Sequence, residues 1–163
     1  MLKNITNEFG GLTYLNYEKS TLYNNTGNDS ISDLGFNIWV VKQVTQNNSL
    51  PLDFNLISNT SYKYFGGLYD YGDAEFRGFN IVNETLPDKS VVAHYFNQSD
   101  ALKGKEYRTE TYDSNGNIFS ATDNNFNFTT TNSSYFIVNL WYVKFFFPIN
   151  PFYVRKAFII SKF

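Results

Sequence analysis

Residues 64–79 read YFGGLYDYGDAEFRGF, and this stretch decides the fold. The β-prone residues around it predict two strands, at residues 61–65 and 76–82, joined by a turn rich in Gly and Asp. We expect Gly66 and Gly67 to close the first strand, because glycine accepts the positive φ that a tight bend needs. The stretch therefore predicts an antiparallel pair of strands.

The second strand carries an ionic and an aromatic side. Glu75 and Arg77 lie two residues apart and share one face, so Phe76 points to the other face. Gly78 indicates a β-bulge or a close backbone approach, which would bring Phe79 onto the face of Phe76.

Arg77 is the residue most suited to joining the turn to the strand. Its planar guanidinium can pair with Glu75, Asp70 or Asp73 through two hydrogen bonds. We interpret the group as architectural. Two alternatives are a pair of catalytic carboxylates, as in a glycosidase, and a calcium site, although the spacing fits no known calcium loop.

Alternating apolar and polar residues predict further strands along the chain. They lie at residues 12–17, 36–44, 91–96, 105–112, 118–122 and 135–142. The apolar run at 91–96 suits a strand buried on both faces. Asn115-Gly116 predicts a type I′ hairpin turn, because both residues tolerate positive φ. No run of ten or more residues has a helical period, so we predict an all-β, antiparallel fold.

Composition excludes several classes of function. The chain has 163 residues, of which 20% are aromatic and 17% charged, and it has no Cys. Cysteine nucleophiles, disulfide scaffolds and thiolate metal sites are therefore excluded, and we expect no cofactor and no metal. The net charge of −2 argues against a nucleic-acid partner. The single histidine, His94, is expected to be a strand residue hydrogen-bonded to a neighbour, since no Gly-x-Ser-x-Gly motif supplies a nucleophile.

Charge divides the chain into residues 1–140 and an atypical tail, residues 141–163. The last acidic residue is Asp123, and the tail has four basic residues and nine aromatic residues. Two prolines and two basic residues interrupt its apolar run, which argues against a transmembrane helix. Three interpretations stay open: an ordinary strand, a membrane-surface segment, and a frame slip in AT-rich DNA.

The motif order resembles a known family. Residues 64–79 are similar to the "GGYYD…REFRGF" signature in the middle region of the B component of bacterial insecticidal toxin complexes, and in related SpvB- and Rhs-type proteins. Residues 2–17 resemble its "L..I.N..G..T.I.Y" opening, and residues 37–45 its "P..VV..V" strand. Residues 112–117 resemble a single YD-repeat core. The likeness covers residues 2–140, and it makes the following residues the structural signature: Gly66, Gly67, Tyr69, Asp70, Glu75, Phe76, Arg77, Gly78 and Phe79.

The resemblance implies a virulence-associated, non-enzymatic role. The family's B component forms a hollow β-shell that encloses the toxic C-terminal region of its partner. This chain would be a fragment of such a shell, folded as a curved open sheet or a sandwich-like slice. The implied partners are other segments or subunits of a toxin complex, with self-association through exposed strand edges. Residues 1–7 lack the apolar stretch of a signal peptide, and the family is implied to be bacterial, cytoplasmic and then secreted.

A stand-alone β-sandwich module that binds carbohydrate or protein is the alternative function. Its motivation is a set of tyrosines that could form a platform for sugar rings. These are Tyr14, Tyr17, Tyr62, Tyr64 and Tyr69.

Overall fold

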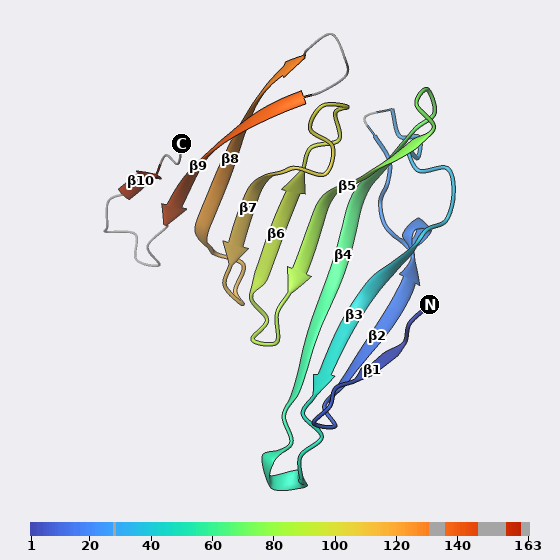
Figure 1. Cartoon of the computed structure of the whole chain (residues 1–163), viewed down its shortest axis with the longest axis vertical. Coiled ribbons are helices and arrows are strands. Elements are labelled where there is room, and N and C mark those ends of the chain that lie inside the picture. The colour runs from blue at the N-terminus through green and yellow to red at the C-terminus, as the bar shows by residue number, and fades with distance from the viewer. Residues whose placement is uncertain (28, 131–135, 147–155, 161–163) are drawn as a thin grey trace.

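The chain folds as one antiparallel sheet of ten strands in sequence order, shown in Figure 1. The computed structural model describes the backbone of residues 1–27, 29–130, 136–146 and 156–160, and most side chains as far as Phe126. The strands are β1 Asn4–Thr6, β2 Leu12–Lys19, β3 Trp39–Asn47, β4 Ile57–Asp70, β5 Glu75–Thr85, β6 Val91–Phe96, β7 Glu106–Tyr112, β8 Ile118–Thr130, β9 Phe136–Phe146 and β10 Lys156–Ile160. The predicted all-β, antiparallel, open sheet is confirmed, and in the described residues no second sheet covers it.

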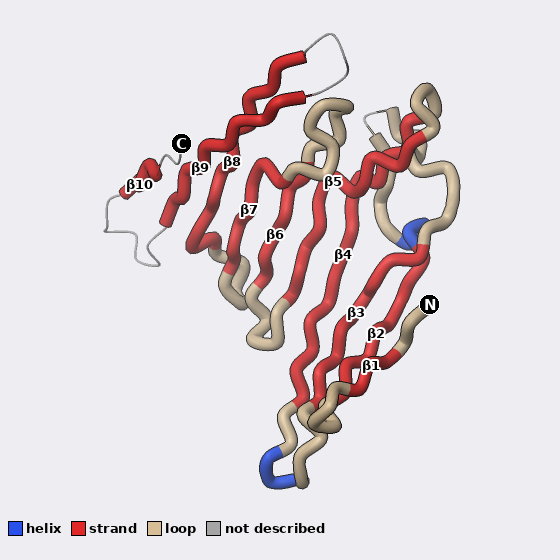
Figure 2. The backbone as a smooth tube through the Cα atoms, viewed as in Figure 1, coloured by secondary structure: helices blue, strands red, loops and turns tan. Residues whose placement is uncertain are grey.

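Two short 3-10 turns are the helical elements of the described backbone, η1 Ser20–Leu22 and η2 Leu52–Phe54 (Figure 2). Four apolar side chains are buried among those described: Leu34, Val40, Ala93 and Ala121. Most other apolar residues stay partly exposed, because a single sheet has no second layer to cover it.

Strand β6 has the predicted bounds, Val91–Phe96, but the expectation that it is buried on both faces is wrong. Ala93 is its one buried residue, and the other five are half-buried. A continuous apolar run usually indicates a strand that other layers cover on both faces. Here the run forms an inner strand of a single-layer sheet.

Strand β4 corrects the prediction that Gly66 and Gly67 end a strand. It continues through both to Asp70. Gly66 has φ +62°, and a Cβ on Gly67 would lie 2.8 Å from Asn25 Oδ1. The two glycines are therefore needed for a local backbone conformation and for a close approach by another segment, while the strand itself goes on.

That segment is the connection between β2 and β3. Strand β3 pairs with β4 only from Ile57 to Ser61. Beyond Ser61 the connection takes over part of the same edge: Gly66 N–H donates to the Asn24 carbonyl and Tyr69 N–H donates to the Asp33 carbonyl, both at 2.9 Å. A loop thus covers an edge that would otherwise be open. The predicted strand at residues 36–44 begins only at Trp39, since the residues before it belong to this connection.

Asn25 fixes the connection to the sheet through a buried amide. Its Nδ2 donates to the Ser20 carbonyl at 2.8 Å, and its Oδ1 accepts the Gly67 N–H at 2.9 Å. Ser20, which is fully buried, exchanges backbone and hydroxyl hydrogen bonds with Ile38. These hydrogen bonds supply partners to buried polar groups, which would destabilise the fold if they had none.

Strand β5 contains the bulge predicted at Gly78. Gly67 faces Phe79 and Tyr69 faces Phe76, so β5 has one more residue than β4 between these pairs. Gly78 has φ +86°, and the rings of Phe76 and Phe79 meet edge to face with centroids 5.6 Å apart. The extra residue brings the two rings together, as the sequence predicted.

The hairpin at Asn115-Gly116 is present, but the predicted type I′ turn is wrong. Gly116 has φ +84°, whereas Asn115 is not left-handed. Gly116 N–H donates to the Asp113 carbonyl, and Asp113 N–H donates to the Asn117 carbonyl. This is a type I turn with a glycine bulge, favoured because the Asp113 carboxylate accepts the N–H groups of Asn115 and Asn117.

The tail continues the sheet in its described part. Strand β9 crosses from residue 140 into the tail, and β10 pairs with it from Lys156–Phe146 to Ile160–Tyr142. These pairings are those of ordinary strands, while the frame-slip interpretation stays a hypothesis about the gene. Residues 147–155 and 161–163 of the tail lie outside the described residues. Among the helices of the described chain, none has the length and apolarity needed to cross a membrane.

The Asn25 amide is expected to contribute measurably to stability. Asn25→Ala removes bonds to two buried backbone groups, so the free energy of unfolding should fall by about 1–3 kcal/mol. Exposed Asn24 provides the matched control, because Asn24→Ala removes only a local turn and should cost less than about 1 kcal/mol. Urea unfolding of both variants would measure this, and equal losses would contradict the role of Asn25.

The bulge is expected to need glycine. Gly78→Ala places a Cβ in the left-handed region and should lower the free energy of unfolding by about 1–2 kcal/mol, although no neighbour obstructs it. Ala74 already has φ +53°, so the opposite change, Ala74→Gly, should be neutral or stabilising. Thermal unfolding would compare the pair. A stable Gly78→Ala variant would show that the backbone there relaxes freely.

Candidate functional site

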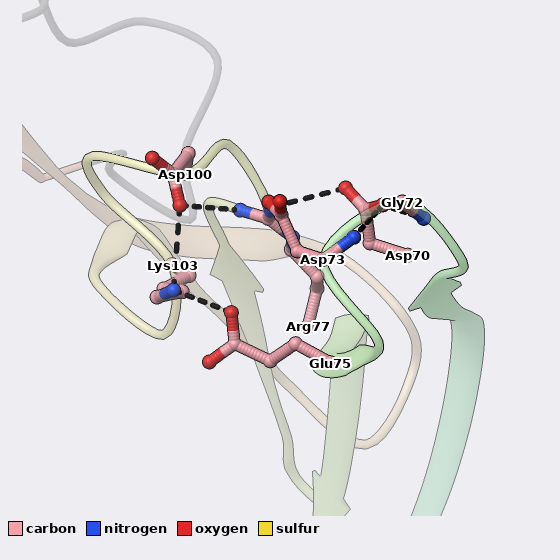
Figure 3. A network of polar contacts seen from close by, with 7 residues as sticks. All are labelled: Asp70, Gly72, Asp73, Glu75, Arg77, Asp100 and Lys103. Carbon is pink, nitrogen blue, oxygen red and sulfur yellow. Dashed lines mark hydrogen bonds and ion pairs between the residues drawn. The ribbon is translucent and has the colours of Figure 1, made fainter.

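The most connected polar cluster surrounds Arg77, and we call it the Arg77 site: Asp70, Asp73, Glu75, Arg77, Asp100 and Lys103 (Figure 3). The Arg77 side chain is 4% exposed. Its guanidinium donates to Asp70 at the end of β4 at 3.0 Å, to Asp100 in the β6–β7 connection at 3.2 Å, and to Asp73 in the β4–β5 turn. Arg77 therefore joins three separate segments of backbone.

Glu75 does not bind Arg77, which corrects one of the predicted pairings. Its carboxylate instead pairs with the Lys103 ammonium, which also lies 3.4 Å from Asp100. The other two predicted partners, Asp70 and Asp73, do bind Arg77. Lys103 takes Glu75 because the β6–β7 connection places this ammonium against the start of β5 (Figure 3).

Asp70 is held in position by the turn itself. Its Oδ1 accepts the N–H groups of Gly72 at 2.8 Å and Asp73 at 3.1 Å, which leaves Oδ2 for Arg77. The backbone N–H groups of Asp73 and Gly72, followed by the charge of Arg77, lower the pKa of the Asp70 carboxyl. The turn thus presents an ionised carboxylate to the guanidinium.

Gln98 completes the contact between the β6–β7 connection and the glycine-rich strands. Its Nε2 donates to the Gly66 carbonyl at 2.7 Å and to the Gly78 carbonyl at 2.9 Å. Gly66 and Gly78 thus have a second role, because their carbonyl groups bind the β6–β7 connection through Gln98.

Sequence reasoning missed Gln98, Asp100 and Lys103. They lie more than twenty residues after Arg77 in an irregular connection, where no periodicity predicts which way a side chain points. The available signal was the polar composition of this connection, in which Lys103 is a cation that can offset the excess of acidic groups around Arg77.

His94 lies in a second polar cluster, on β6. Its Nδ1 lies 2.6 Å from Glu106 Oε1, and its Nε2 lies 3.5 Å from Glu84 Oε2. Thr109 donates to the same Glu106 oxygen at 2.7 Å. The prediction of a strand histidine hydrogen-bonded to a neighbour is confirmed. The nearby Thr109 hydroxyl donates to the Glu106 carboxylate.

Glu110 forms a third cluster, on the other face of the sheet. It is 9% exposed and accepts hydrogen bonds from Tyr95, Tyr112 and Arg108 at 2.7, 2.5 and 2.7 Å. Burial alone would raise the pKa of Glu110, but hydrogen bonds from Tyr112, Tyr95 and Arg108 outweigh it and lower that pKa. Arg108 also pairs with Asp123 of β8 at 2.8 Å, so this cluster links three strands.

The predicted tyrosine platform is divided between β2 and β4, which β3 separates. Tyr64 donates its hydroxyl to the Val41 carbonyl at 2.7 Å, and burial raises the pKa of Tyr64 to about 12. Tyr62 donates to Glu84, and Tyr69 packs edge to face on Phe36. Tyr14 is 41% exposed. Tyr62, Tyr64 and Tyr69 thus contribute to packing and hydrogen bonding within the sheet.

In its described residues the chain is a one-layer β-sheet protein, and its polar clusters join separate backbone segments to each other. In the described part of the chain, no group of three or more His, Asp or Glu residues is arranged to hold a metal ion. The three clusters make hydrogen bonds and ion pairs, which hold strands and loops together.

The chain belongs to the family described as the insecticide toxin TcdB middle/N-terminal region, whose model matches residues 1–113. The resemblance of residues 64–79 to the middle region of the toxin-complex B component is thereby confirmed. No curated protein matches the chain significantly.

Solved structures share the fold. The crystal structure of TcdB2-TccC3 has a TM-score of 0.68 at 17% identity, covering 89% of this chain and 11% of that one. The Photorhabdus luminescens Tc holotoxin pore has a TM-score of 0.69 at 16% identity, covering 90% of this chain and 10% of that one. The chain therefore spans about a tenth of the length of these relatives.

The carboxylates of two clusters predict a loss of stability in acid. Asp70 and Glu110 have lowered pKa values in the folded state. Their contribution is complete above their unfolded values, near 4, and is lost as pH falls through the lower folded values. Urea midpoints between pH 7 and pH 2.5 should therefore fall most steeply below about pH 4. The variants Asp70→Asn and Glu110→Gln should each flatten this fall, and an unchanged profile in both would contradict the assignment.

Proposed function

We propose that this chain is a non-catalytic structural segment of a toxin-complex B-type shell, and that it acts by forming part of the enclosing wall. The observation that carries the proposal is the match of one open, ten-stranded sheet to about a tenth of the TcdB2-TccC3 chain. A wall needs a continuous hydrogen-bonded surface, and a single antiparallel sheet provides one.

The two edges of the sheet are suited to partners that add a further β-strand. Strands β1 and β10 are the outermost strands of the described sheet. Within the described residues no further strand pairs with the outer edge of either, which suits other segments or subunits of a toxin complex. The same edges favour self-association of the isolated chain.

We propose a non-catalytic role because the candidate acidic and histidine side chains are paired with other side chains of the chain. Asp70 and Asp73 bind Arg77, Glu75 binds Lys103, and His94 lies against Glu106. A general acid or base needs a group free to exchange a proton with substrate, whereas these groups are joined to each other. A carbohydrate-binding role has less support, because Tyr62 and Tyr64 donate their hydroxyls within the sheet.

A graft tests the structural role directly. Residues 1–113 would replace the matching segment of TcdB2 in the TcdB2-TccC3 complex, and electron microscopy would report whether the particle closes. We expect closed particles whose resistance to added protease equals that of the unaltered complex measured in parallel. A graft of the same length with a scrambled sequence is the control and should give open or aggregated particles.

Two results would contradict the proposal. One is an open particle although hydrogen exchange shows the grafted sheet to be folded. The other is hydrolase activity of the purified chain on a panel of glycosides that is lost in Asp73→Ala and retained in Asp123→Ala.

A further inference from the structure

The connection between β6 and β7, residues 97–105, is a small closed unit that we call the strap. Asn97 N–H donates to the Lys105 carbonyl, and Gly104 N–H donates to the Asn97 carbonyl, each at 2.9 Å. Gly104 takes φ +74°. These bonds close the strap at its own base and involve no residue of β4 or β5.

The polar bonds that hold the strap to β4 and β5 come from three side chains of the strap. Gln98 binds the carbonyl groups of Gly66 and Gly78, Asp100 binds Arg77, and Lys103 binds Glu75. Two of these three attachments are ionic.

On the side of the strap toward β8, the described residues leave a hollow. A hollow of about 430 Å³ lies between the strap and β8, lined by residues that include Leu102, Tyr107 and Phe126. The strap thus has firm polar attachments on one side and room on the other.

The charges around the attachment are unbalanced. Four carboxylates, those of Asp70, Asp73, Glu75 and Asp100, face two cations, Arg77 and Lys103. Arg77 is buried, whereas the Asp73 and Asp100 side chains are 60% and 62% exposed. Protons reach the carboxylates readily from solvent, and their loss of charge would leave two cations close together without counter-ions.

We propose that the strap is a hinged unit that the Arg77 site holds against the bulge of β5, and that it lifts when the carboxylates lose their charge while the sheet stays folded. Lifting exposes the carbonyl groups of Gly66 and Gly78 together with Arg77. The inference concerns a movement within the chain, and it holds whether or not the chain forms a shell wall.

Two spin labels would follow the movement, because the chain has no cysteine of its own. The reporter pair is Ala101→Cys on the strap and Tyr71→Cys on the exposed β4–β5 turn. The reference pair is Asn16→Cys on β2 and Lys63→Cys on β4, both within the sheet. Pulsed electron paramagnetic resonance would give the distance distribution of each pair at pH 7 and pH 3.

At pH 7 we expect a narrow distribution for both pairs. At pH 3 the reporter pair should move to longer distances, with the closed population reduced about tenfold or more, as the loss of charged hydrogen bonds implies. The reference pair should not change. Arg77→Gln and Asp100→Asn should give the open distribution already at pH 7, whereas Glu18→Gln, which removes a charge from the distant Lys42 pair, should not.

Each other outcome overturns the proposal. A reporter distance that stays the same at pH 3 means that the charges do not hold the strap. Simultaneous broadening of both pairs means that acid unfolds the sheet as a whole. An open strap in Glu18→Gln means that the effect is not specific to the Arg77 site.

Discussion

The backbone hydrogen bonds between successive strands are the interaction on which the rest of this structure depends. Each strand pairs with the strands before and after it in the chain, from β1 to β10. In most domains a second layer buries the apolar face of such a sheet. Here four apolar side chains are buried among those described, so burial contributes less than usual and the strand pairing contributes more.

Polar side chains take over part of the role of a core. Asn25 fixes a loop to β4, Arg77 joins two turns to a bulge, and Glu110 links three strands. Each cluster is anchored on a group that is nine-tenths or more buried. The side-chain polar atoms of Asn25 and Glu110 have partners, whereas Nε of Arg77 has none among the described residues. Such clusters demand specific partners, which favours one register over its neighbours.

The sequence predicted strands well where the signal is local. A continuous apolar run located Val91–Phe96, and Gly78 located the bulge, because both signals involve residues next to each other. It failed where a distant segment determines the structure. Gly66 and Gly67 read as the end of a strand, because nothing nearby in the sequence reveals that Asn24, Asn25 and Leu34 approach them. The Arg77 site was half predicted for the same reason. Asp70 and Asp73 are local to Arg77, whereas Asp100 and Lys103 come from the next connection but one.

The strict order of the strands has a consequence for how the chain acquires its structure. Apart from the β2–β3 ladder, whose connection spans residues 20–38, each ladder closes a short loop, so the cost in chain entropy of most new pairings is small. A hairpin can form as soon as its second strand has left the ribosome, and each later strand finds its template already in place. The sheet can therefore grow from one end to the other during synthesis, as repeat proteins do, without waiting for the last residue.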